Sequence, residues 1–204
     1  MGWVRKLYDW ILKWAETPYG PIALFILSFA EASFFPIPPD ALLIALVLGA
    51  RTKAFRFASL STLGSILGAF LGYAIGYFVW WSGDQSFSEV AIFFFDNIPG
   101  FTHDVFYRVQ DLYKEWDFWI IFTAGFTPIP YKVFTVTSGA FEINLPMFTL
   151  ASIVSRGARF FLVAFLIWKY GEHIKVFIDK YFNLLAVAFT VLLIGGFVLI
   201  KYAL

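Results

Sequence analysis

The stretch EASFFPIPPD, residues 31–40, interrupts an apolar region with three prolines and ends on an acid. The apolar runs on either side hold only about 10–14 residues each, whereas a membrane-spanning helix needs about 20. Proline lacks the N–H that a helix interior requires, so Pro36, Pro38 and Pro39 break the helix. We therefore predict that residues 21–50 enter a bilayer as one helix, turn at the prolines and return as a second. Asp40 is placed to cap that second helix.

The same pattern returns at TPIPYK, residues 127–132, where Pro128 and Pro130 again separate two short apolar runs. The shared P-I-P lies 92 positions further along the chain. Paired, proline-interrupted segments in two halves of a chain are typical of transporters built as inverted repeats. We expect residues 118–141 to form a second re-entrant hairpin. Prolines that merely kink two ordinary spans are the alternative.

The composition indicates a membrane protein. Of the 204 residues, 60% are hydrophobic and 14% are charged, whereas a soluble domain is about 45–50% apolar and about 25% charged. These values also exclude a disordered chain, and the net charge of +1 offers no basic excess for nucleic acid. We predict one membrane domain over residues 1–204. Besides the hairpins, it has an amphipathic N-terminal helix (1–17, with a signal peptide as the alternative), spans at 58–81, 147–168 and 182–200, and a polar external segment with a surface helix (84–117).

Glycines recur at every fourth position of the span 58–81 and therefore share one helical face. Small residues at this spacing allow a second helix to approach closely. We expect this face to be a packing surface, and a thin wall beside a substrate path is the alternative. The four positions are Gly64, Gly68, Gly72 and Gly76.

Charged loops predict the orientation. The loop 51–56 carries a charge of +3, while segment 84–117 has two basic and seven acidic residues, a net charge of −5. Basic loops tend to stay in the cytoplasm. If the two hairpins enter from opposite faces, every basic cluster lies on the cytoplasmic side. Two kinked full spans would instead place basic clusters on both sides, so the charge pattern favours the hairpins.

Five ionisable residues fall inside apolar stretches, where a charge costs about 2.5–3.5 kcal/mol on insertion scales. Together they carry an excess of one positive charge, which suits a phosphate monoanion, and arginine forks match phosphate geometry. An unpaired carboxylate in an apolar environment retains its proton more readily, so the acids are candidates for proton coupling. Ion pairs that only brace the hairpins are the alternative. The predicted phosphate contacts are Lys132, Arg156 and Arg159, and the predicted proton-coupling acids are Glu31 and Asp40.

No pattern in the sequence predicts catalysis. The chain has no cysteine, and His103 and His173 stand alone in polar links without the spacing of metal ligands. We therefore expect no enzymatic activity, no metal and no cofactor. The expected partners are membrane lipids and protons, and self-association into a homo-oligomer is left open.

Residues 31–40 resemble the first hairpin of the DedA/VTT (SNARE-associated Golgi protein) family, which carries two acids at the same nine-residue separation. The stretch GFTPIPYKVFTVTSG, residues 125–139, is similar to the second hairpin of that family. The stretch SRGARFF, residues 155–161, looks like its YqaA-like branch. The resemblance covers about residues 20–170 and departs at Gly125, where the family has an arginine. It implies two opposed re-entrant hairpins and proton- or potential-linked handling of polyprenyl phosphates or phospholipids.

These observations predict an all-α polytopic membrane protein of the bacterial inner membrane. Its fold is expected to be an inverted repeat of two re-entrant hairpins with about three full transmembrane helices. The expected function is a proton- or potential-linked transporter or flippase for a phosphate-bearing lipid. Whether Arg156 and Arg159 replace the arginine that is missing at Gly125 is left open. A proton- or cation-coupled small-solute transporter and a non-transporting scaffold are the alternatives.

Overall fold

The computed structural model describes residues 13–14, 17–35, 37–83, 86–127 and 129–171. The predicted span 182–200, His173 and most of the predicted N-terminal helix lie outside the described residues. The described chain is all-helical, which confirms the all-α part of the predicted fold class. In order, its elements are α2 (Gly20–Ser33), α3 (Asp40–Gly49), the 3-10 turn η1 (Arg51–Lys53), α4 (Ala54–Trp80), α5 (Glu89–Asn97), α6 (His103–Glu115), α7 (Asp117–Phe126), α8 (Tyr131–Ala140) and α9 (Leu145–Tyr170).

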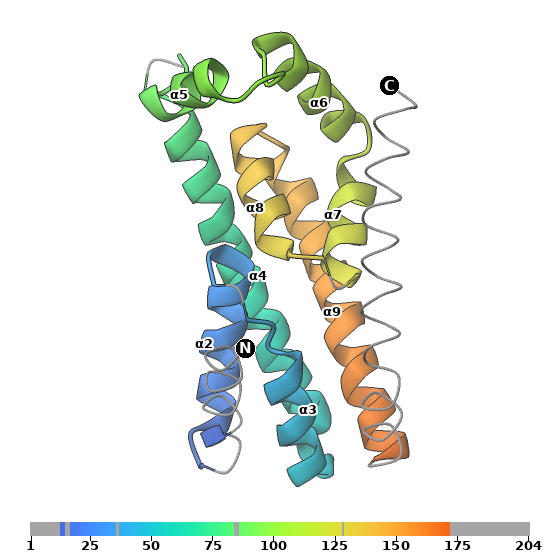
Figure 1. Cartoon of the computed structure of the whole chain (residues 1–204). Coiled ribbons are helices and arrows are strands. Elements are labelled where there is room, and N and C mark those ends of the chain that lie inside the picture. The colour runs from blue at the N-terminus through green and yellow to red at the C-terminus, as the bar shows by residue number, and fades with distance from the viewer. Residues whose placement is uncertain (1–12, 15–16, 36, 84–85, 128, 172–204) are drawn as a thin grey trace.

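Two long helices, α4 and α9, run the length of the molecule and pack against each other (Figure 1). They contain 27 and 26 residues, and each is long and apolar enough to cross a membrane. α4 begins before its predicted span 58–81 and ends one residue short of it, and α9 extends beyond the predicted span 147–168 at both ends. At the start of α9 the side chain of Asn144 accepts a hydrogen bond from the Met147 N–H at 3.1 Å, which begins the helix before its apolar run.

Two pairs of short helices enter this frame from opposite ends (Figure 1). In the first pair α2 runs to about the middle of the long helices and α3 returns; in the second, α7 descends from the other end and α8 returns. Each second helix follows a proline, Pro39 before α3 and Pro130 before α8. Pro38 also lies in the first break, while Pro36 and Pro128 fall outside the described residues.

Asp40 does not cap α3 as expected. It is the first residue of the helix, Pro39 occupies the cap position, and no side-chain capping bond forms there. The carboxylate of Asp40 instead accepts hydrogen bonds from Arg159. A charged partner across the fold therefore replaces the local capping interaction.

The glycine face of α4 lies against both short pairs. A Cβ at Gly68 would overlap the carbonyl oxygen of Phe29 in α2, and a Cβ at Gly76 would overlap that of Val136 in α8. Neither site has room for a side chain, so α4 acts as the common support of α2 and α8. Of the predicted glycines, Gly64 and Gly68 lie against α2, Gly76 lies against α8, and Gly72 lies between Thr135 of α8 and the Ala32 carbonyl of α2.

Residues 84–117 contain two helices, α5 and α6, in place of the single expected surface helix. Ser88 caps α5 and Thr102 caps α6, each by accepting a hydrogen bond from a backbone N–H. Trp80, at the end of α4, stacks on Phe106 of α6 with ring centroids 5.4 Å apart. α5 was not predicted because its apolar residues form a continuous run without helical periodicity.

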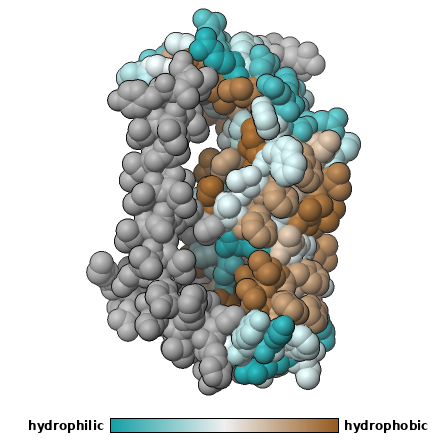
Figure 2. All heavy atoms as spheres, turned by 90° about the vertical axis from the view of Figure 1, so that its right-hand side faces the viewer, coloured by the Kyte–Doolittle hydropathy of each residue, from teal (hydrophilic) through white to brown (hydrophobic). Residues whose placement is uncertain are grey.

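The outer surface is apolar along much of its length. Figure 2 shows a hydrophobic band between hydrophilic ends, interrupted by a hydrophilic patch at about mid-height. Phe78 of α4 is 75% exposed, and Leu150 and Ile153 of α9 are also exposed. Exposed apolar area of this extent marks a surface that contacts lipid or another apolar partner.

Candidate functional site

The breaks in the two short pairs approach each other near the middle of the molecule (Figure 1). The Thr135 hydroxyl of α8 donates a hydrogen bond to the Ala32 carbonyl of α2 at 2.9 Å. Tyr131, the first residue of α8, is fully buried and donates its hydroxyl hydrogen to Ser152 of α9 at 2.6 Å. These two bonds join α8 to both the first short pair and a long helix.

Arg156 lies buried at the centre of this junction. Its Nη2 is 2.6 Å from Oε2 of Glu31, and its Nε donates to Ser65 Oγ at 2.7 Å. Its guanidinium carbon lies 4.9 Å from the ring centroid of Tyr131 and 4.6 Å from that of Phe160, so aromatic faces also contact the charge. One arginine of α9 therefore connects α2, α4 and α8.

Arg159, one turn further along α9, contacts both breaks. Its Nε and Nη2 donate to the two oxygens of Asp40 at 3.2 and 3.0 Å, the bidentate geometry that makes charge-assisted pairs strong. Its Nη1 donates to the Thr127 carbonyl at 2.6 Å, just after α7 ends at Phe126. The arginine thus satisfies a carbonyl at the end of one half-helix and the carboxylate at the start of another.

The structure brings together four of the five predicted charged residues as two separate pairs. The sequence predicted Arg156 and Arg159 as contacts of a bound phosphate. Instead, each guanidinium has its own carboxylate: Glu31 for Arg156 and Asp40 for Arg159. The four charges cancel within the protein.

Lys132 is the fifth predicted residue, and it forms no ion pair with any residue in the described part of the chain. It lies half-buried in the first turn of α8, where the helix dipole is positive. Its carbonyl oxygen accepts from Thr135 at 3.0 Å, the same hydroxyl that reaches α2. Among the described residues, Lys132 is therefore the predicted charge that no carboxylate compensates.

Gly125 lies in α7, two residues before the second break. A Cβ at this position would overlap the hydroxyl of Ser155 in α9. No side chain fits there without a shift, and the guanidinium of Arg159 reaches the neighbouring carbonyls from α9 instead.

Ser65 and Tyr131 contact Arg156 but were not predicted as members of the site. Ser65 carries a signal that sequence reading could have used, because its hydroxyl lies within an apolar span and beside the glycine face. A buried hydroxyl needs a partner. Tyr131 appeared only as a position in the second proline motif, and nothing local indicates that its ring contacts an arginine of a distant helix.

Outside this junction the described residues hold no group of three side chains suited to a metal. His103 lies at the start of α6, where its ring stacks on Phe95 with centroids 4.0 Å apart. Burial raises the pKa of Tyr113 on α6, so its hydroxyl stays neutral. Neither residue belongs to the charged junction.

The fold and site define an all-helical protein with two helices of membrane-spanning length and two interior arginine–carboxylate pairs. The chain is 38% identical over 165 residues to "Uncharacterized protein HI0703 homolog" of Histophilus somni, covering 78% of each chain. It is 31% identical over 200 residues to "Uncharacterized protein" of Haemophilus influenzae (strain ATCC 51907 / DSM 11121 / KW20 / Rd), covering 96% of each. The chain therefore belongs to the family of these proteins. No family model and no solved structure matches it.

Proposed function

We propose that this protein is integral to the bacterial inner membrane, with α4 and α9 crossing the bilayer. Both helices have the required length and hydropathy, and apolar side chains such as Leu67 and Leu150 are exposed along them. The hydrophobic band in Figure 2 has hydrophilic ends, as expected of a surface that passes through a membrane. The relatives from Haemophilus and Histophilus support a bacterial setting.

In this membrane, the two short pairs are re-entrant hairpins that form an inverted repeat. The half-helices contain 10–14 residues, too few for a span of about 20. Their packing supports a two-fold relation between the halves: α2 and α8 pack on α4, while α7 and α3 pack on α9. Breaks in a bilayer require buried partners for their backbone groups, and Arg159 supplies one for Thr127.

The topology is tested with single cysteines in this cysteine-free chain. Thr52→Cys in η1 and Asp104→Cys in α6 both lie at exposed positions near opposite ends of the molecule. We expect an impermeant maleimide to label each from a different side of the membrane. Labelling of both positions from the same side of the membrane would contradict the re-entrant topology.

We further propose that the protein transports or flips a phosphate-bearing lipid. The observation that carries this proposal is a set of positive groups at the two helix breaks: the partly exposed Arg159–Asp40 pair, and Lys132 at the start of α8, which has no ion pair among the described residues. The N-termini of α3 and α8 direct their positive dipole ends toward these breaks. A phosphate headgroup is the lipid chemistry that this charge and donor arrangement accommodates.

Proton coupling follows from the same pairs. A phosphate and the carboxylate of Asp40 compete for one guanidinium fork on Arg159. Protonation of Asp40 removes its negative charge and leaves the fork free for the phosphate. Glu31 pairs with Arg156 in a more enclosed position, so Asp40 is the acid that links a proton to ligand binding.

The resemblance to the DedA/VTT family agrees with this proposal. At Gly125, the position of the missing family arginine, a side chain would overlap the hydroxyl of Ser155. Arg159 instead places a guanidinium at the end of α7. Charge supplied from a neighbouring helix compensates for the residue that the motif lacks.

The test is translocation of a labelled phospholipid or polyprenyl phosphate in proteoliposomes, with and without a pH gradient. We expect Arg159→Ala and Asp40→Asn to abolish transport while the protein remains monodisperse. Arg159→Lys should restore little, because an ammonium group cannot reproduce the planar fork. Arg56→Ala, on the exposed first turn of α4, is the matched control and should leave transport unchanged.

Other outcomes separate the alternatives. Full lipid transport by Arg159→Ala would contradict a phosphate contact. Uptake of a small ion or solute without lipid movement would favour a proton- or cation-coupled solute transporter. Loss of folding in every charge variant would favour a scaffold in which the pairs only brace the hairpins.

A further inference from the structure

The end of the molecule at which α4 begins and α9 ends carries exposed cations (lower end of Figure 1). The loop 51–56 has a charge of +3, and Lys169 lies in the last turn of α9. Of the loop cations, Arg51 lies against α9, because a Cβ at Gly171 would overlap its guanidinium. Arg51 and Lys169 therefore meet at one helix end. Neither forms an ion pair with a described residue.

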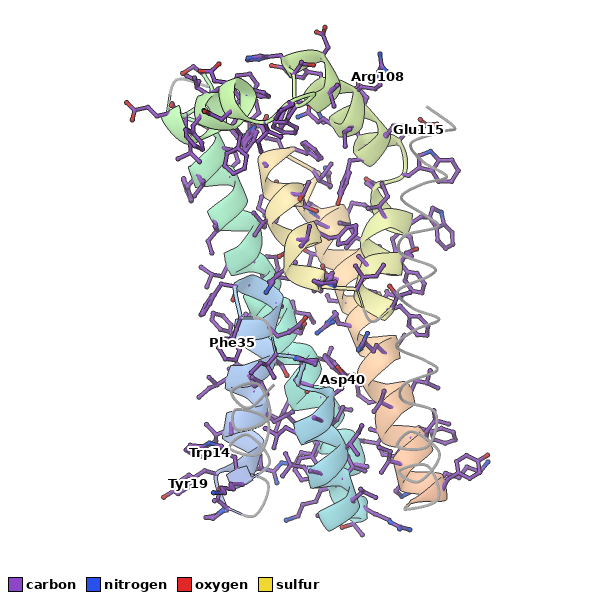
Figure 3. The ribbon with its side chains drawn as sticks, in the orientation of Figure 1. Trp14, Tyr19, Phe35, Asp40, Arg108 and Glu115 are labelled. Atoms are coloured by element: carbon purple, nitrogen blue, oxygen red, sulfur yellow. The ribbon has the colours of Figure 1, made fainter. Side chains whose placement is uncertain are left out.

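The described carboxylates lie elsewhere in the molecule. Figure 3 shows Asp40 near mid-height and Glu115 at the opposite end. The helix that connects Asp40 to η1, α3, has ten residues and is about 15 Å long. The other described acids belong to the charged junction, to α5, α6 and the start of α7, or to the turn after α8. Among the described residues, the η1 end of the molecule therefore keeps its positive charge.

The flanking segments do not reverse this excess. Segment 1–17 has three basic and two acidic residues, and segment 172–180 has two of each. Most of these residues lie outside the described part of the chain. Their sum adds one further positive charge.

Exposed aromatic rings continue from the two cations along α9. Phe55 of α4 contacts Trp168 and Phe161 of α9, with ring centroids 5.8 and 6.2 Å apart. Phe165 lies 6.0 Å from Trp168, and its ring centroid is 5.7 Å from Nζ of Lys169. All four aromatic residues are exposed. From Lys169 to Phe161 this aromatic row is about 12 Å long at 1.5 Å per residue, which approaches the 15 Å or so of one hydrocarbon leaflet.

The opposite end of the molecule offers no comparable surface for an anion. Arg108 of α6, labelled in Figure 3, has Asp104 and Asp111 one helical turn away on either side. The segment 84–117 that contains them has a net charge of −5. Only the η1 end, which faces the cytoplasm in the proposed topology, combines an excess of cations with exposed rings among the described residues.

We propose that Arg51, Lys169 and the aromatic row bind one anionic glycerophospholipid of the cytoplasmic leaflet. The headgroup phosphate lies at the two cations, and an acyl chain lies along the row toward the middle of the molecule. The inference rests on the proposed membrane topology but not on lipid transport. This lipid is a bound partner and not the cargo, because Lys169 is ten residues, or about 15 Å, from Arg159 along α9.

The charge and polarity of the surface select this lipid class. Two cations exceed the charge of one phosphate, so the ammonium of a zwitterionic headgroup would add repulsion, whereas an anionic headgroup adds none. Soluble anions such as nucleotides would leave the aromatic row uncovered. A phospholipid in its usual orientation has its phosphate at the membrane boundary and its chains toward the centre, the same order as the cations and the row.

The experiment titrates the full chain, delipidated in detergent, with phosphatidylglycerol or with phosphatidylcholine of identical acyl chains. Native mass spectrometry counts the bound lipids. Both lipids carry a phosphate, so the difference between them reports the net negative charge. We expect the first phosphatidylglycerol to bind about tenfold or more tightly than phosphatidylcholine, since each cation near an anionic lipid contributes a factor of about five.

Single variants locate the headgroup. Arg51→Ala and Lys169→Ala should each weaken phosphatidylglycerol binding about fivefold, and Arg51→Lys should keep most of the affinity. Arg56→Ala is the matched control, because it removes the same charge from the same end of the molecule. Arg56 follows Phe55 directly and therefore points about 100° away from the row. Its variant should bind like the parent.

Crosslinking locates the acyl chain. Phosphatidylglycerol with a diazirine in the middle of one chain is illuminated with the protein in vesicles, and the crosslinked peptides are mapped by mass spectrometry. We expect labelling to concentrate at Phe161 and Phe165. The exposed face of α4 around Leu63, seven residues after Arg56 and on the same side of the helix, is the reference for ordinary lipid contact.

The outcomes separate this inference from the proposed transport. Equal affinity for the two lipids, undiminished phosphatidylglycerol binding in both alanine variants, or equal labelling of the row and the Leu63 face would each overturn it. Should Arg51→Ala fail to fold, Lys169→Ala and the crosslink map of the parent decide. A parent protein that binds phosphatidylglycerol at this surface but moves no lipid supports the inference, and the transport proposal alone then fails.

Discussion

The two arginine–carboxylate pairs sit one turn apart on α9 but in different surroundings. In the Arg156–Glu31 pair, the two side chains are 2% and 11% exposed, whereas in the Arg159–Asp40 pair they are 15% and 22% exposed. Arg156 is enclosed by a serine hydroxyl and two aromatic rings. Arg159 uses a bidentate fork and a backbone carbonyl.

This difference in exposure indicates different roles for the two pairs: one stabilises the junction, and the other can exchange its anionic partner. A charge that is buried and loses its partner remains without water, which costs about 3–5 kcal/mol. A pair with some access to the surface can exchange one anionic partner for another at a lower cost. We therefore assign the Arg156–Glu31 pair to holding the junction together and the Arg159–Asp40 pair to contacting the ligand.

The largest expected effect on stability is at the more buried pair, Arg156–Glu31, which we call the inner pair. Arg156→Ala should lower the free energy of unfolding by about 3–5 kcal/mol, because Glu31 then remains buried and unpaired. The measurement is thermal or denaturant unfolding in detergent, with Arg56→Ala as the control on α4. The double variant Arg156→Met with Glu31→Leu should regain much of the loss, since it leaves no buried charge. An unfolding midpoint equal to that of the parent in Arg156→Ala would refute the holding role.

The more exposed pair, Arg159–Asp40, is the outer pair. Its variants should show a smaller loss of stability and a larger loss of lipid transport. Arg159→Ala should cost about 1.5–3 kcal/mol, the range for hydrogen bonds to charged groups. Asp40 can still reach water in that variant, because its side chain is 22% exposed. Unfolding in detergent and lipid transport are measured on the same preparation. A stability loss equal to that of Arg156→Ala would remove the distinction between the pairs.

A smaller loss of stability is expected when the hydroxyl of Ser65, which contacts Arg156 of the inner pair, is removed. Ser65→Ala removes the acceptor that receives the Nε hydrogen of Arg156 and should cost about 1–2 kcal/mol. Ser59→Ala is the matched control, since Ser59 is exposed on the same helix and bonds only to its own backbone turn at Phe55. Comparable destabilisation by the two serine variants would show that the contact with Arg156 contributes little.

The smallest stability effect belongs to Lys132. Because it has no ion pair among the described residues, Lys132→Ala should change the free energy of unfolding by less than about 0.5 kcal/mol. Transport of a phosphate-bearing lipid should nevertheless fall, since the positive charge that balances the phosphate is lost. Lys53→Ala, in the exposed turn η1, is the control. Normal transport by Lys132→Ala would remove this lysine from the site.

Several features of the molecule were predictable because their causes are local. Proline cannot continue a helix, so the motifs at 36–39 and 128–130 predicted breaks that the described residues show. Glycine spacing of four marks one face of a helix, and all four glycines of α4 lie at close helix contacts. The helix ends were harder to predict: α4 and α9 are both longer than the predicted spans, and α9 begins at Leu145 because the side chain of Asn144 caps it.

The partners within the site could not be predicted for a different reason. Two arginines and two carboxylates in an apolar region must find counter-charges, but their spacing along the chain does not select one pairing over another. The contacts of Ser65 and Tyr131 with Arg156 likewise join residues that are far apart in sequence.

By itself, then, the sequence determined the helical class, the two breaks and the set of charges that an apolar interior has to accommodate, since proline, glycine and burial act through the nearest neighbours or through composition. Only the tertiary structure decided that Arg156 meets Glu31 in an enclosed pocket while Arg159 meets Asp40 nearer the surface. The crossing of α2 and α8 over the glycine face of α4, together with the packing of α3 and α7 on α9, sets those positions. Distances between helices arise from packing and cannot be read from spacing along the chain.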